Sequence, residues 1–107
     1  MTDKIIVFVT AESKEEAEKI AEALVTEKLA ACVNVLPGIR SCYVWERKMT
    51  WSEEVLLMIK TTLGRFGQLQ DRVRELHSYE VPEIASVSID AASQPYLDWI
   101  DTSVGGR

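Results

Sequence analysis

Apolar residues fall into short blocks along this chain, and their spacing alternates between that of strands and that of helices. The first block, Ile5–Val9, is an unbroken run of β-branched and aromatic residues, which predicts a strand covered on both faces. Ser13 and Glu16 then fit a capping box, in which the serine accepts from an exposed helix N–H and the glutamate reaches back to the cap. The apolar positions that follow recur at helical spacing and predict a helix from about Lys14 to about Leu29.

The next two blocks are long and predict a hairpin. Cys32–Trp45 is rich in strand-forming residues, and the pair Pro37–Gly38 in its middle marks a bulge or a bend. A strand of that length spans roughly 45 Å at about 3.3 Å per residue, whereas common strands span about 17–20 Å. The return strand is expected from about Trp51 to about Lys60. A small sheet with one helix layer cannot cover such a hairpin, so its aromatic outer half predicts an oligomer.

The remaining blocks complete a recognisable order of elements. A second amphipathic helix is expected to begin after Gly64–Gly67 and to end near His77, and a polar connection, His77–Glu83, follows it. Apolar and polar residues alternate over 85–90, which predicts a strand with one polar face. Pro95 fits the first turn of a short third helix, and residues 105–107 are expected to fray. The order β-α-β-β-α-β plus a short C-terminal helix predicts an α+β fold of the ferredoxin-like, split βαβ type. We expect one domain over residues 1–107, with an antiparallel four-stranded sheet and helices on one face.

Composition and charge narrow the function classes. The chain has 107 residues, and 12 basic against 17 acidic side chains give a formal charge of −5. Its apolar fraction of 47% excludes a disordered chain, and its longest apolar runs are far below the about 18 residues of a membrane span. The acidic balance argues against nucleic-acid binding, which requires a basic patch. With no export signal visible, a cytoplasmic location is expected, where Cys32 and Cys42 are free thiols.

The chain has a single histidine, His77, which limits the chemistry available to one subunit. Glu80 and Glu83 follow it closely, and imidazole with carboxylates suits a borderline divalent metal, which a nearby thiolate would shift toward copper. The competing interpretation is a histidine at a helix C-terminus, where the helix dipole favours a cationic ring. No base–nucleophile pair is evident, because free cysteines are more often small buried residues, so an enzyme is not expected.

Several blocks of the chain resemble the divalent-cation-tolerance family, CutA. These blocks are Lys28–Ser41, Tyr43–Glu46, Glu54–Thr61 and His77–Ile84, and Tyr96–Ile100 is similar to the closing helix of the family. The resemblance covers essentially the whole chain. It implies a ferredoxin-like subunit in a compact homotrimer whose long hairpins pair between subunits. It also implies a role in tolerance of copper and other divalent metals.

The resemblance further implies a set of site residues. In some family members the proposed copper ligands are a cysteine at the end of the first strand and two consecutive histidines after the second helix. Val9 and Leu76 stand at two of these positions here, and His77 alone matches, so His77 is the expected ligand for copper or another divalent cation. The positions lining the family's cleft between subunits are matched by Cys32, Tyr43, Trp45, Lys60, Tyr79, Glu80 and Glu83.

Three functions are compatible with this resemblance. The first is a trimeric metal-response protein that binds copper or another divalent cation weakly through His77. The second is a small-molecule-sensing protein resembling trimeric nitrogen-regulatory signalling proteins, with Lys60 as the anchor for an anionic group. The third is a structural or anchoring trimer. None of them requires an organic cofactor, a nucleic acid, a membrane or a catalysed reaction.

Overall fold

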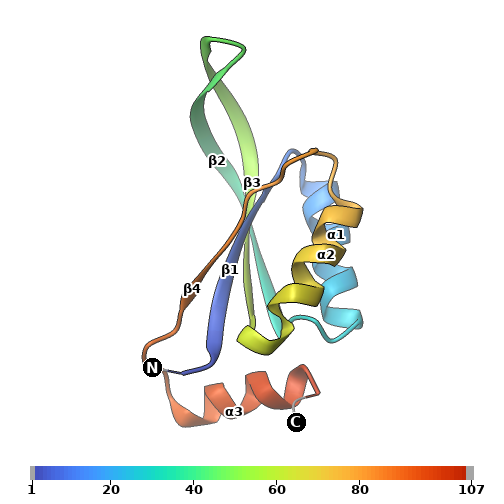
Figure 1. The fold of residues 1–107 in the computed structure, drawn as a ribbon, viewed down its shortest axis with the longest axis vertical. Coiled ribbons are helices and arrows are strands. Elements are labelled where there is room, and N and C mark those ends of the chain that lie inside the picture. The colour runs from blue at the N-terminus through green and yellow to red at the C-terminus, as the bar shows by residue number, and fades with distance from the viewer. Residues whose placement is uncertain (1, 106–107) are drawn as a thin grey trace.

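The computed structural model describes residues 2–105, so the expected fraying of residues 106–107 lies outside the described part of the chain. The elements follow the predicted order along the chain (Figure 1). They are β1 (Lys4–Ala11), α1 (Lys14–Thr26), β2 (Cys32–Trp45), β3 (Lys48–Thr62), a single 3-10 turn (Leu63–Arg65), α2 (Phe66–Leu76), β4 (Ile84–Ser88) and α3 (Gln94–Ser103).

The four strands form one antiparallel sheet in the order β2-β3-β1-β4, and α1 and α2 lie together on one face of it (Figure 1). This arrangement confirms the predicted ferredoxin-like α+β fold. The core lies between that face and the two helices. Its centre is made by alternate positions of the two central strands, Ile5, Val7 and Val9 of β1 and Leu57 and Ile59 of β3, all of them buried.

Helix α1 begins as the sequence predicts and ends earlier. The Ser13 side chain accepts the backbone N–H of Glu16 at 3.1 Å, so the serine is the N-cap. The helix ends at Thr26 because Lys28 adopts a left-handed backbone conformation, with φ at 61°. The N–H groups of Leu29 and Ala30 then donate to the carbonyl oxygen of Leu24 and close the helix end. The prediction that the helix extends to Leu29 was therefore wrong by one turn.

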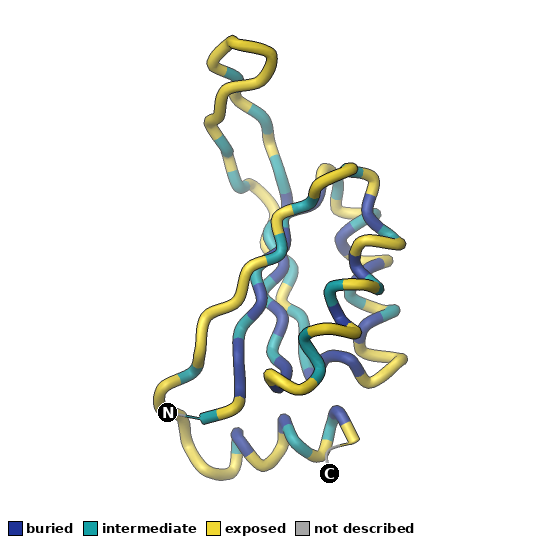
Figure 2. The backbone as a smooth tube through the Cα atoms, in the orientation of Figure 1, coloured by how far each residue is buried: buried dark blue, intermediate teal, exposed yellow. Residues whose placement is uncertain are grey.

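Strands β2 and β3 continue far beyond β1 and form a two-stranded extension, residues 39–54, which we call the arm. Figure 2 shows that the arm is exposed or half-buried throughout, with no buried residue. It makes the molecule 46 Å long, and the radius of gyration is 14.5 Å against about 13 Å for a compact chain of this length. The single long bent strand predicted for Cys32–Trp45 is confirmed.

A bulge at the base of the arm determines which side chains share a face. Leu36 pairs with Leu56 and Ile39 with Glu54, so Pro37 and Gly38 together oppose one residue of β3. Gly38 takes a φ of 83°, which favours glycine. Glu54 and Leu56 share a face by alternation, and paired residues lie on the same face. Ile39 and every second residue after it therefore continue the face of Leu36.

The face of the sheet opposite α1 and α2, which we call the open face, is largely apolar. Its members by alternation are Lys4, Ile6, Phe8 and Thr10 of β1, Cys32, Asn34 and Leu36 of β2, Leu56, Met58, Lys60 and Thr62 of β3, and Ala85 and Val87 of β4. Strand β4 is an example of this division between the two faces of the sheet. Ser86 pairs with buried Val7 and so faces the helix side, whereas Val87 lies on the open face and is 50% exposed. The polar face predicted for this strand is thus on the helix side.

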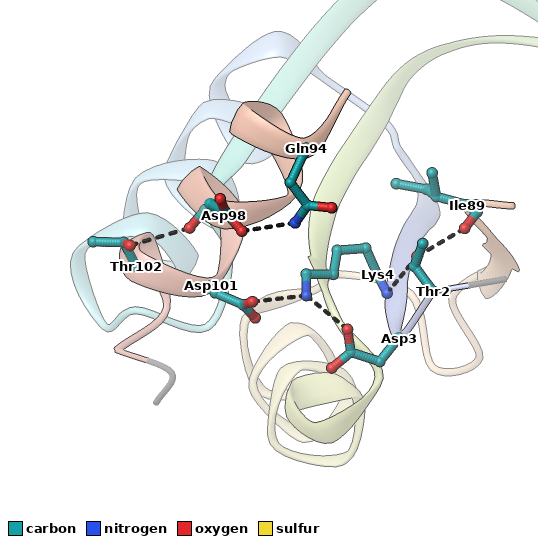
Figure 3. Close-up of polar contacts among 8 residues, drawn as sticks. All are labelled: Thr2, Asp3, Lys4, Ile89, Gln94, Asp98, Asp101 and Thr102. Carbon is teal, nitrogen blue, oxygen red and sulfur yellow. Dashed lines mark hydrogen bonds and ion pairs between the residues drawn. The ribbon is translucent and has the colours of Figure 1, made fainter. Parts of the chain in front are cut away.

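Helix α3 lies across the lower end of the sheet and is fixed there by packing and by ion pairs (Figure 1). Ile100 and Val104 pack with Ala31 in a second, smaller core cluster. The Lys4 ammonium group donates to Asp101 of α3 at 2.8 Å and to Asp3 at 2.7 Å (Figure 3). Lys4 is buried, so these two carboxylates compensate for the loss of its hydration.

Replacing Asp101 with asparagine is expected to destabilise the folded chain by about 1 kcal/mol, because Asp101 is half exposed and the ion pair is screened by water. The hydrogen bond to Asp101, followed by that to Asp3, raises the pKa of Lys4 above its ordinary value. The ion pair therefore contributes fully below about pH 10 and is lost as the pH rises through the raised pKa of Lys4. Urea unfolding of wild type and Asp101→Asn from pH 8 to strongly alkaline pH should show the difference shrinking. Asp98→Asn on the same helix is the control, and an equal loss there would refute the ion-pair explanation.

Candidate functional site

The predicted site residues lie in three separate places within one chain. Cys32 and Lys60 face each other near the lower end of β2 and β3. Tyr43 and Trp45 lie on the arm. The remaining four, His77, Tyr79, Glu80 and Glu83, belong to the connection between α2 and β4.

The first group sits on the open face. Cys32 pairs with Lys60 in the ladder, and the Lys60 ammonium group donates to the side-chain oxygen of Asn34. Tyr96 of α3 is a neighbour of Cys32 that the sequence did not assign to the site. Burial raises the pKa of the Tyr96 phenol, and the nearby Cys32 thiol raises it further. This end of the open face therefore combines a thiol, an ammonium group, an amide and a phenol.

The second group is exposed on the arm. Tyr43 and Trp45 are 43% and 64% exposed, although large aromatic side chains are mostly buried in folded proteins. The Tyr43 hydroxyl donates to the Ser52 hydroxyl across the hairpin at 3.2 Å. Because of the bulge, both aromatic side chains continue the open face of the sheet.

The third group is organised around the buried imidazole of His77. Its Nε2 lies 2.7 Å from the carbonyl oxygen of Thr10, and the backbone N–H of Tyr79 lies 3.0 Å from its Nδ1. The Tyr79 ring packs beside the imidazole, with 4.7 Å between the ring centroids. His77 comes directly after α2, as the sequence predicts.

Two residues that sequence reasoning did not assign to the site hold this connection in place. The Glu16 carboxylate accepts the backbone N–H of Ser78 at 2.7 Å and that of Glu12 at 3.3 Å. Burial raises the pKa of Glu16, but the hydrogen bonds from Ser78 and Glu12 outweigh it and hold the pKa below its usual value. The capping box identified Glu16 in the sequence. No sequence pattern shows that its carboxylate also bonds to Ser78, 62 positions away.

The second of these residues is Glu54, at the base of the arm. The Tyr79 hydroxyl donates to the Glu54 carboxylate at 2.9 Å. Burial and then this hydrogen bond raise the pKa of Tyr79, so the phenol keeps its proton and acts as a donor at neutral pH. No sequence pattern pairs these two residues, which are 25 positions apart.

Glu80 and Glu83 take no part in the hydrogen bonds of the His77 imidazole. Both are exposed, and within residues 2–105 no hydrogen bond or ion pair joins either carboxylate to His77. Val81 between them is 86% exposed. The acids therefore form the outer rim of the connection and do not complete a ligand set with His77.

The donor groups of one chain do not fit a tightly bound copper ion. In the described part of the chain, no three histidine, cysteine, aspartate or glutamate side chains converge. Val9 is completely buried, and Leu76 packs against the core. The imidazole of His77 already uses both ring nitrogens in hydrogen bonds within the chain.

The Lys60 group is too far from the other two groups to act with them in one chain, whereas Tyr43 of the arm lies near Tyr79 of the connection. Lys60 and Glu54 are six residues apart on β3, which corresponds to roughly 20 Å at about 3.3 Å per residue. The aromatic residues of the arm lie further still from Lys60, along the same hairpin. Only contacts between chains could bring all three groups into one cleft.

A surface hollow between α2 and the turn that follows α1 lies apart from these groups. Its volume is about 380 Å³, and it is lined by Glu27, Leu29, Gln68, Asp71, Arg72 and Glu75. The Arg72 guanidinium is held there by both oxygens of Glu27 and by Glu75.

Within residues 2–105, no helix has the length and apolar character that crossing a membrane requires.

Comparisons with known proteins match one family along almost the whole chain. The sequence profile described as CutA1 divalent ion tolerance protein matches residues 5–103. The divalent-cation tolerance protein CutA of Thermus thermophilus is 45% identical over 100 residues, which make up 94% of this chain and 97% of that protein. The crystal structure of CutA from Xylella fastidiosa superposes with a TM-score of 0.94 at 37% identity, over 96% of this chain and 99% of that one.

A third relative bears on location. The structure of the Archaeoglobus fulgidus protein, described as a periplasmic divalent cation tolerance protein CutA, gives a TM-score of 0.92 at 40% identity. The match covers 94% of this chain and 98% of that one. Because this relative is described as periplasmic, the cytoplasmic location stays a prediction.

Proposed function

The chain belongs to the CutA1 divalent ion tolerance family, and on that premise we propose that it acts in divalent-cation tolerance as a homotrimer with a ligand cleft between subunits. The family is named for tolerance of divalent ions and not for a catalysed reaction, which agrees with the absence of a predicted base–nucleophile pair. The proposal depends on assembly, because the candidate site residues of one chain remain apart.

The open face of the sheet is the observation that carries this proposal. Phe8, Leu56 and Met58 line its middle, where neither α1 nor α2 covers them, and Val87 and Leu36 lie exposed at its edges. A continuous apolar face of this kind, together with the bare aromatic arm, is typical of a surface that another chain covers.

The arm and the open face together favour a closed ring of chains over a two-fold symmetric dimer. The arm and the open face are different surfaces, so an arm that covers the next chain's open face makes a head-to-tail contact. Head-to-tail contacts close into rings when the rotation between neighbours allows it. The family resemblance implies three subunits in that ring.

Such a ring would bring the three groups of site residues to one cleft. The arm of one chain would carry Tyr43 and Trp45 toward the neighbour, where Lys60 or the His77 connection is available. A cleft with apolar walls and a few convergent polar groups is the usual form of a small-ligand site. Lys60 is the expected anchor for an anionic group, since within residues 2–105 no carboxylate pairs with its ammonium.

The mass in solution tests this proposal directly. Light scattering on the purified chain at micromolar concentration should give three times the chain mass of 12.1 kDa. A measured mass of one chain would refute the trimer and, with it, the shared cleft.

A further inference from the structure

Three consecutive residues, His77, Ser78 and Tyr79, each bond to a different element of the fold. His77 bonds to the carbonyl oxygen of Thr10 at the end of β1, at 2.7 Å. Ser78 donates its backbone N–H to Glu16 of α1, at 2.7 Å. Tyr79 donates its hydroxyl to Glu54 of β3, at 2.9 Å. One turn of connection is therefore fixed at three points.

The hydrogen bonds of His77 define its tautomer. The Thr10 carbonyl oxygen can only accept, so Nε2 must carry the proton, and Nδ1 accepts the backbone N–H of Tyr79 at 3.0 Å. This neutral imidazole has no lone pair left for a metal. Binding a metal at Nδ1 would leave the Tyr79 N–H without its acceptor, and binding at Nε2 would deprive the Thr10 carbonyl of its donor.

We propose that His77, Ser78 and Tyr79 form a clasp that fixes the connection between α2 and β4, and that His77 serves this clasp instead of binding a metal. The buried position of His77 agrees with a structural role. The residues beside the bonded pair, Val9 next to Thr10 and Leu76 next to His77, are apolar and pack into the core, so neither offers a second ligand.

The clasp also joins the connection to the arm. Ala11 and Val55 are the last pair between β1 and β3, and Glu54 is the next residue, at the point where the arm leaves the sheet. Tyr79 therefore bonds at the base of the arm while the neighbouring His77 bonds to β1. Through these contacts the clasp sets the position of exposed Glu80 and Glu83 relative to the arm. The clasp and this positioning need only one chain. Only the use of Glu80 and Glu83 in a ligand cleft rests on the proposed function.

The single histidine makes the clasp directly measurable. In protein labelled with ¹⁵N-histidine and prepared without a histidine tag, every imidazole signal belongs to His77. The spectrum should show the Nε2–H tautomer and no shift of either nitrogen when Zn(II) is added to excess. A shift that saturates at one Zn(II) per chain would overturn the proposal, as would the Nδ1–H tautomer in the metal-free protein.

Matched variants test the attachment of Tyr79 to Glu54. Tyr79→Phe removes the bond to Glu54 and is expected to speed amide hydrogen exchange at positions 78 and 79, whose N–H groups are bonded in the clasp, about fivefold, equivalent to about 1 kcal/mol. Tyr96→Phe removes a phenol hydroxyl from α3, at the other end of the sheet, and should leave exchange in these residues unchanged. Equal exchange in Tyr79→Phe and wild type would contradict the clasp.

Copper itself provides the last readout. Calorimetric titration of Cu(II) into wild type and His77→Asn should give the same affinity, whereas binding lost only in His77→Asn would overturn the proposal. If His77→Asn does not fold, the wild-type spectrum in Zn(II) decides the question alone. The mass measurement is independent of these results: a monomer with the expected tautomer contradicts the trimer only, and a trimer with a Zn(II)-shifted imidazole contradicts the clasp only.

Discussion

Replacing Val87 with aspartate is expected to convert the proposed trimer into single chains. Val87 lies on the open face of β4 and is 50% exposed in the isolated chain, where a carboxylate would remain hydrated. In the proposed trimer the same carboxylate would be buried against apolar side chains without a partner. An uncompensated buried charge costs about 3–5 kcal/mol, and symmetry introduces it once in every subunit. Light scattering at micromolar concentration should then give the mass of one chain.

Val25→Asp is the matched control for this variant. Val25 is 44% exposed, so the two valines are almost equally accessible, but Val25 belongs to α1 on the other side of the sheet. It should leave the mass unchanged. Dissociation in both variants would indicate a general loss of stability, and a trimer that survives Val87→Asp would exclude the open face as the interface.

Removing the outer part of the arm is expected to give a folded monomer. Joining Arg40 to Glu53 through an Asn-Gly turn would delete residues 41–52 and restore a two-residue hairpin of a type that suits antiparallel strands. None of the buried core residues in the described chain belongs to this segment. The core should therefore keep its packing, while the aromatic surface proposed to cover a neighbour disappears.

Circular dichroism together with light scattering would check this second result. A native-like spectrum with the mass of one chain is expected, a threefold decrease from the proposed trimer. Wild type at the same concentration is the reference for both measurements. A shortened chain that still forms trimers would show that the arm is dispensable for assembly, and one that unfolds would show that the arm stabilises the subunit itself.

The sequence predicted most of the fold because the relevant information is local. Helical spacing and the cap at Ser13 predicted where α1 begins, and the many strand-forming residues of Cys32–Trp45 predicted a strand of unusual length. The helix end was missed because it depends on the left-handed conformation of Lys28, and lysine carries no strong preference for that region. Pro37 and Gly38 predicted a bulge, but not which aromatic side chains it would place on the open face.

The candidate site was predicted less completely because its bonds connect distant parts of the chain. Composition identified His77 as the only imidazole, and the family resemblance singled out Tyr79 and Lys60. The partners of the clasp, Thr10, Glu16 and Glu54, lie 67, 62 and 25 positions from the residues they bond. Their types are common on solvated surfaces, so nothing in the sequence distinguishes them before the chain has folded.

By itself, then, the sequence determined the elements, their order and the presence of a single imidazole, since these follow from residue type and from spacing within one element. The tertiary structure decided what that imidazole does. Its tautomer and its availability to a metal depend on which groups face Nδ1 and Nε2. Those groups meet only after β1 and the connection after α2 pack together, because a hydrogen bond acts over about 3 Å in space whatever the separation along the chain.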